Sequence, residues 1–173
     1  DMQPDMIWFK RRDSAAYPSL IDAVRGVTKR LAPSEDGAEG TVSDMLASFD
    51  SDGFTLDDDG DNYINYNTAT YVAWCWKESA TAGFDIVSYT GNGTAGKTVS
   101  HSLSAVPDFF FLKNRSTGST QWVTWGSWMA NTNALYINLT NALGTSQTYL
   151  NSTTPTSSVI TLGDGNDENK NTD

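Results

Sequence analysis

The sequence has 173 residues, enough for one ordinary domain or two small ones with a hydrophobic core. Acidic residues outnumber basic ones by 21 to 11, which gives a formal net charge of -10. Such a chain repels phosphate backbones and anionic membranes, so its charge disfavours nucleic-acid binding as the main role. No apolar run approaches the length of a membrane span. We therefore expect no nucleic-acid partner and no membrane insertion.

Short apolar runs, rich in aromatic and β-branched residues, alternate with dense turn residues along the whole chain. This pattern is typical of an all-β protein. The predicted strands are residues 5–10, 45–50, 53–56, 69–77, 83–89, 97–102, 108–114, 121–126, 134–139 and 158–162. One helix is predicted over residues 19–31, where apolar residues approximate helical spacing, although Gly26 weakens the pattern.

Two segments of the chain resemble two later segments. "PDMIWFKRR" (4–12) parallels "PDFFFLKNR" (107–115), and "SDGFTLDDDGDN" (51–62) parallels "SSVITLGDGNDEN" (157–169). A spacing of roughly a hundred residues between the matches indicates an internal repeat. We therefore predict tandem β-sandwich units, jelly-roll or lectin-like, with a first unit over 1–80 and a second over 81–173. Each unit is expected to be incomplete, and the second is expected to be truncated before its last strand. Flanking sequence or other subunits would supply the missing strands.

Several motifs resemble the repeated units of uncharacterised structural proteins of marine tailed bacteriophages. They are "PDMIWFK", "SFDSDGFTL", "TYVAWCWK", "FDIVSYTGNGTAG", "VPDFFFLKNRS" and "NSTTPTSSVITLG". The resemblance implies a β-rich virion protein without established catalytic residues. The expected function is a structural component of a phage virion, such as a tail fibre, an appendage or a surface decoration. It would act outside the cell in the assembled virion, as a homo-oligomer that contacts other virion subunits and serves host attachment.

The stretch "TGNGTAGKTVS" (90–100) fits the written pattern of a phosphate-binding P-loop, with Gly91, Gly96, Lys97 and Thr98 at the required spacing. A P-loop needs a helix that begins at the lysine, whereas "TVSHSLSAVP" leaves about two turns before Pro107. In the resembled family this segment is a strand, a glycine-rich turn and a second strand. We therefore interpret Lys97 as a solvated residue at the start of a strand.

Two acidic turns are candidate calcium sites. In "TLDDDGDN", Asp57, Asp59 and Asp61 alternate as ligands of a cation-binding turn do, and in "GDGNDEN" the candidates are Asp164, Asn166 and Glu168. A helix-loop-helix calcium loop has glycine at its sixth position and glutamate at its twelfth, whereas counting from Asp57 these are Asn62 and Thr68. The alternative is that both are solvated β-turns, because Asp, Asn and Gly are the residues that turns need. We favour this alternative, so no cofactor is expected and calcium is the only candidate ion.

Aromatic residues suggest a second function, a carbohydrate-binding module. Trp74 and Trp76 share one face of a strand and are expected in the core, whereas Trp125, Trp128 and Tyr136 are the candidates for stacking on a host-surface glycan. A third function, a polysaccharide depolymerase, would need two carboxylates across a cleft, and clustering in a turn does not place them so. With one cysteine and one histidine in the chain, nucleophilic catalysis has a single candidate base. We predict a protein that is not an enzyme.

Overall fold

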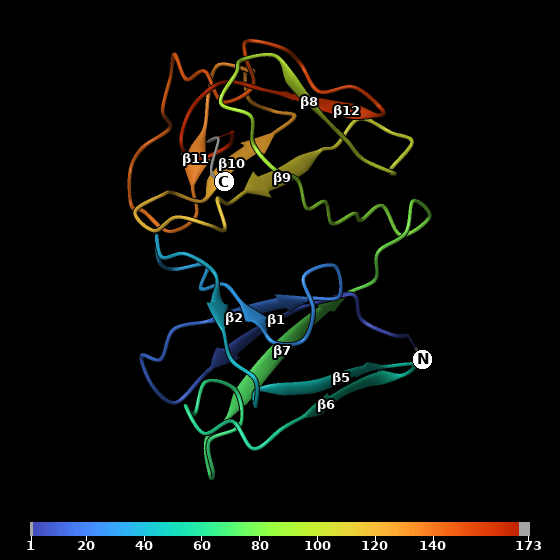
Figure 1. The fold of residues 1–173 in the computed structure, drawn as a ribbon, viewed down its shortest axis with the longest axis vertical. Coiled ribbons are helices and arrows are strands. Elements are labelled where there is room, and N and C mark those ends of the chain that lie inside the picture. The colour runs from blue at the N-terminus through green and yellow to red at the C-terminus, as the bar shows by residue number, and fades with distance from the viewer. Residues whose placement is uncertain (1, 170–173) are drawn as a thin grey trace. The chain divides into compact units, whose positions relative to one another are not determined.

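The computed structural model describes residues 2–169 (Figure 1). The chain divides into two compact units, and each is made of more than one segment. Unit 1 comprises Asp1–Ser34 with Glu39–Ile86, and unit 2 comprises Glu35–Ala38 with Val87–Asp173. All regular elements over residues 2–169 are β-strands, which confirms the predicted all-β class. This same part of the chain contains no helix that could cross a membrane.

Unit 1 is built on a three-stranded antiparallel sheet in which β1 lies between β2 and β7 (Figure 1). Two hairpin-like pairs complete it, β3 with β4 and β5 with β6. The strands are β1 (Met6–Arg11), β2 (Ser19–Asp22), β3 (Lys29–Arg30), β4 (Gly40–Thr41), β5 (Leu46–Asp50), β6 (Gly53–Leu56) and β7 (Tyr71–Trp76).

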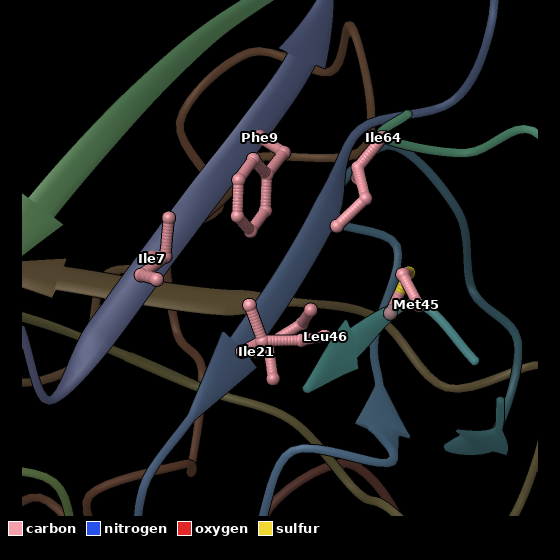
Figure 2. Packing of buried hydrophobic residues seen from close by; sticks show 6 residues of the cluster. All are labelled: Ile7, Phe9, Ile21, Met45, Leu46 and Ile64. Carbon is pink, nitrogen blue, oxygen red and sulfur yellow. The ribbon is translucent and has the colours of Figure 1, made fainter. Parts of the chain in front are cut away.

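The core of unit 1 forms where one face of the β1 sheet meets the β5–β6 pair. Figure 2 shows Ile7 and Phe9 of β1 together with Ile21 of β2, and these three side chains are at most 2% exposed. The same cluster includes Met45, Leu46 and Ile64. Burial of each such side chain contributes about 1.5–3 kcal/mol, so this apolar face holds the small sheets of the unit together.

Unit 2 contains a three-stranded antiparallel sheet in the order β11–β10–β9 and a separate antiparallel pair, β12 with β8. The strands are β8 (Lys97–Ser100), β9 (Phe109–Leu112), β10 (Val123–Gly126), β11 (Leu135–Tyr136) and β12 (Val159–Leu162). Its core cluster consists of Val99, Trp125, Leu150, Ile160 and Leu162. Strands of both sheets therefore supply the core of this unit.

The helix predicted over residues 19–31 is wrong. Leu20 and Ile21 instead lie on β2, where they pair with Trp8 and Ile7 of β1. A turn follows, in which Gly26 adopts a φ of +97°, a conformation that side chains with a Cβ rarely adopt. The apolar residues at near-helical spacing thus lie in a strand and a turn. Pairing with β1 buries all of β2, and this tertiary contact overrides the local helical pattern.

The strand predicted over residues 83–89 is also wrong. Phe84 makes one isolated bridge, with Ser79, and no ladder continues from it. The main-chain N–H of Ile86 is bonded to the Asp85 carboxylate at 2.9 Å, which replaces a ladder hydrogen bond. A strand-like composition gives no strand here because, within residues 2–169, the single Ser79–Phe84 bridge is the only strand pairing of this stretch.

The internal repeat inferred from the sequence extends to strand register. In unit 1, Trp8 pairs with Leu20, and Leu20 makes a bridge with Leu31. In unit 2, the corresponding three-strand row is Phe111, Thr124 and Leu135. The repeat therefore equates β1 with β9, β2 with β10 and β6 with β12.

Candidate functional site

The glycine-rich loop that matches the P-loop pattern has its amide groups already bonded within the protein. Asn92 N–H donates to Asn169 Oδ1 at 3.0 Å, and Gly93 N–H donates to the Asn169 carbonyl at 2.8 Å. Gly96 N–H donates to the carbonyl of Leu162 at 2.8 Å, and Lys97 begins β8 rather than a helix. A phosphate cradle needs free amides that converge at a helix N-terminus, so this loop is a structural turn.

The first acidic turn is organised by Asp59, which is 1% exposed. Its Oδ2 accepts hydrogen bonds from the N–H groups of Ile64 and Asn65, at 2.6 and 2.7 Å. Its Oδ1 is buried and accepts no hydrogen bond from residues 2–169. Asp57 and Asp61 are exposed. The buried carboxylate therefore acts as a cap for the main chain of the turn.

The second acidic turn is organised in a similar way by Glu168, which is 3% exposed. Its Oε1 accepts the N–H of Gly165 at 2.9 Å, while burial raises the pKa of the carboxyl group. Asp164 and Asn166 are exposed. Over residues 2–169, no group of three or more His, Cys, Asp or Glu side chains is placed to hold a metal ion. Within residues 2–169 the candidate calcium ligands are thus not gathered into such a group, and in each turn one of them, Asp59 or Glu168, is buried and bonded to the main chain.

The three aromatic candidates for glycan stacking do not form one strip. Trp125 is 3% exposed, stacks on Phe110 in the core and donates its indole N–H to the Ala130 carbonyl at 3.2 Å. The prediction that Trp125 offers a face to a sugar is therefore wrong, because packing against β9 buries it. Tyr136 is half-buried, and its hydroxyl is bonded to that of Tyr149 at 2.8 Å.

Trp128 is the exposed member of the three, with 68% of its surface accessible. Its ring is nearly parallel to that of Phe109, with an interplanar angle of 7° and centroids 6.2 Å apart. Phe111 contacts Phe109 edge-on from the same face of β9. A Cβ on Gly126 would lie 2.3 Å from the Trp128 ring, so only glycine leaves room for this placement. We refer to Phe109, Phe111 and Trp128 as the aromatic surface.

Strand β6 has one unpaired edge. Asp57 N–H donates to the Met45 carbonyl at 3.1 Å, so the main chain of Asp57 faces β5. Because alternate residues of an antiparallel strand face opposite neighbours, the N–H and C=O groups of Phe54 and Leu56 face away from β5. No strand within residues 2–169 pairs on that side. We call it the outer edge of β6.

Strand β9 also has one unpaired edge. Ser127 N–H donates to the Asp108 carbonyl at 2.8 Å, so the main chain of Asp108 faces β10. By the same alternation, the main-chain groups of Phe109 and Phe111 face the other side, where the described chain again supplies no strand. We call this the open edge of β9. It carries two of the three residues of the aromatic surface.

The two open edges are reciprocal between the units. The equivalent of β9 is β1, whose second edge is occupied by β7, and the equivalent of β6 is β12, whose edge is occupied by β8. Exposure follows this difference in both directions. Met6 of β1 is 4% exposed and its equivalent Phe109 is 48% exposed, whereas Leu162 of β12 is fully buried and its equivalent Leu56 is half-buried. The presence or absence of a neighbouring strand accounts for both of these differences in exposure.

Acidic groups gather beside the end of β7. Asp5 Oδ2 accepts the N–H of Glu78 at 2.7 Å and lies 3.8 Å from Lys77 Nζ. Burial raises the pKa of the Glu78 carboxyl, and a hydrogen bond with the Asp85 carboxyl raises it further. The sequence patterns did not single out this group, because its members are far apart in the chain.

Cys75 and His101 give no sign of a catalytic arrangement. Cys75 is half-buried, and burial raises the pKa of its thiol, which disfavours the reactive thiolate. His101 Nε2 lies 3.1 Å from the carbonyl of Thr156, a main-chain contact.

Comparison with known proteins gives a family without an assigned function. The family model described as a domain of unknown function, DUF7483, matches residues 1–173, and the chain therefore belongs to that family. No curated protein and no solved structure matches the chain.

The different placement of two tryptophans predicts different stability effects. Trp125→Ala should lower the free energy of unfolding of unit 2 by about 3–5 kcal/mol, because it removes a buried aromatic side chain. Trp128→Ala should lower it by about 1 kcal/mol or less, since only an exposed ring contact is lost. Denaturant unfolding of the two variants and the parent chain measures both values. Equal losses would contradict the burial assigned to these residues.

Glu78 predicts a pH effect on stability. The pKa of Glu78 is higher in the folded chain than the ordinary value of 4.5. The contribution of Glu78 to the free energy of unfolding is therefore complete below about pH 4.5 and is lost as the pH rises through the folded pKa. Glu78→Gln keeps the neutral form at all pH values and should make the chain more stable than the parent near pH 8, with the difference shrinking toward pH 4. Thermal unfolding across this range tests it. If the parent chain instead becomes more stable than Glu78→Gln as the pH rises, the prediction is wrong.

Proposed function

We propose that this chain, as a member of the DUF7483 family, is a structural module of a bacteriophage virion, in a tail fibre, an appendage or a surface decoration. Its repeated units would join other repeats and subunits by pairing strands, and the assembled form would be a homo-oligomer exposed outside the cell. The resemblance of its motifs to repeated units of phage structural proteins supplies the biological setting.

The observation that carries the proposal is the reciprocal pair of open edges. An unpaired strand edge is a row of main-chain donors and acceptors that readily pairs with another chain. Monomeric proteins protect such edges, whereas repeat arrays and assemblies cover them with the next unit. Among residues 2–169, each unit leaves open the edge that its counterpart has covered. This property fits a module that neighbouring repeats or subunits complete.

The aromatic surface favours a second candidate function, a carbohydrate-binding module. An exposed indole such as that of Trp128 can stack on a sugar ring. Ser127, its neighbour in the chain, donates a 3.1 Å hydrogen bond from its hydroxyl to the Asp108 carboxylate. The two functions are compatible, because a surface decoration can also contact host glycans. Binding to a glycan array that Trp128→Ala removes would favour this second function.

The virion assignment predicts where the protein is found. Antibodies raised against the purified chain should label intact particles of the virus whose genome encodes it, in immunogold electron microscopy, on the tail or the capsid surface. Particles of an unrelated phage serve as the control. If purified particles carry no label and no peptide of this chain by mass spectrometry, while infected cells contain it, the virion assignment is wrong.

A further inference from the structure

The pairing of β8 with β12 shows how an edge of this type is covered. The two strands are antiparallel, and Val99 lies opposite Ile160 while Lys97 lies opposite Leu162. His101 N–H donates to the Ser158 carbonyl at 2.9 Å, so residues 158, 160 and 162 turn their main-chain groups toward β8. Val99 and Ile160 are 8% and 9% exposed, and both belong to the core of unit 2.

The outer edge of β6 offers the same arrangement. Phe54 and Leu56 are the equivalents of Ile160 and Leu162, and their main-chain groups point to the same side of the strand as those of their equivalents do. We infer that this edge binds a strand of the β8 type from another DUF7483 repeat, antiparallel and in the register of β8 on β12. The inference rests on the proposed function, since it names the partner through which the modules join.

The register fixes which side chain of the incoming strand becomes buried. The residue in the place of Val99 would lie opposite Phe54, and the residue in the place of Lys97 would lie opposite Leu56. Phe54 packs against the core of unit 1 and meets Phe9 edge-on, with centroids 5.3 Å apart. A β-branched residue beside Phe54 would therefore extend that core. The neighbouring positions can be polar, as Thr98 and Ser100 are exposed in β8.

The charge and length of the occupant also follow from β8. Lys97 is the charged residue of that strand, and the strand runs for four residues only. The outer edge of β6 ends at Leu56, after which come the exposed carboxylates of Asp57 and Asp58. A lysine opposite Leu56 would lie near this acidic segment, which favours a basic residue at that end. The partner strand is thus short, with one buried apolar residue and a basic residue two positions before it.

The test uses the intact chain and a synthetic peptide. The peptide has the sequence TAGKTVSHS of residues 94–102, with blocked ends, and the chain is labelled with nitrogen-15. The peptide should shift the amide signals of Phe54 and Leu56 and slow their hydrogen exchange by at least about tenfold, because both N–H groups become bonded. Signals of Phe109 and Phe111 on the open edge of β9 should not respond.

Two modified peptides test the chemistry without altering the protein. Methylation of the main-chain nitrogen at the valine position removes a donor that faces Phe54, and should weaken binding by at least about tenfold. Methylation at the preceding threonine, whose N–H faces away, is the matched control and should leave binding within about threefold of the parent peptide. Replacing the valine by aspartate should also abolish binding, since it would bury a charge beside Phe54.

Several outcomes would overturn the inference. Saturating peptide that leaves Phe54 and Leu56 unchanged would do so, and so would responses confined to Ile160 and Leu162, which would mean exchange with the chain's own β8. Equal weakening by the two methylated peptides would exclude the proposed register. These results are independent of particle labelling: binding without label on virions would place the same strand pairing in another assembly, and label without binding would leave a virion protein that joins its neighbours by other contacts.

Discussion

The hydrogen-bonding requirement of the strand edges is the constraint on which this structure depends. Each main-chain N–H and C=O on a strand must be bonded to protein or to water, and a hydrophobic strand left half-paired is exposed along its length. Unit 1 meets the requirement at β1 by placing β7 beside it, whereas no strand within residues 2–169 covers the outer edge of β6, which is left to water. Unit 2 covers β12 and leaves β9 open. The two copies of the repeat thus have different strand edges covered by a neighbouring strand.

Within each unit, buried polar side chains hold the loops by hydrogen bonds to the main chain. Asp59 bonds two amides of the first acidic turn. Asn169 donates to the carbonyls of Thr94 and Gly163, at 2.8 and 2.6 Å, and so ties the glycine-rich loop to the end of unit 2. Short strands need such anchors because ladders of four residues contribute few hydrogen bonds of their own. The loops that look most like ligand sites in the sequence are therefore part of the framework.

Much of the fold follows from the sequence, because strand composition and the repeat are local or nearly local signals. Residues 53–56 and 158–162 were recognisable by their shared apolar, threonine and leucine pattern, and β6 and β12 lie there. The segments 19–31 and 83–89 were misread because their structure depends on partners. Pairing with β1 makes a strand of the first segment, whereas the second makes one isolated bridge among the described residues and forms no strand.

The candidate site was less predictable for the same reason. Trp125 and Trp128 are the same residue type and only three positions apart, yet Trp125 lies in the core and Trp128 on the surface. Which of them is buried depends on Phe109 and Phe110, on opposite faces of β9, and no single-sequence pattern gives that choice. Asn169 was missed because its partners are more than seventy residues away or lie in the adjacent turn. The open edges could be inferred in outline from the repeat, but not assigned to residues.

Hydrogen exchange of the isolated chain tests the central claim most directly, because it measures each main-chain N–H separately. The account predicts weak protection for Phe54 and Leu56 on β6 and for Phe109 and Phe111 on β9. It predicts strong protection for Ile160 of β12 and Trp8 of β1, whose equivalent edges are covered. Equal protection of the equivalent pairs, Phe54 with Ile160 and Phe111 with Trp8, would contradict the reciprocal open edges.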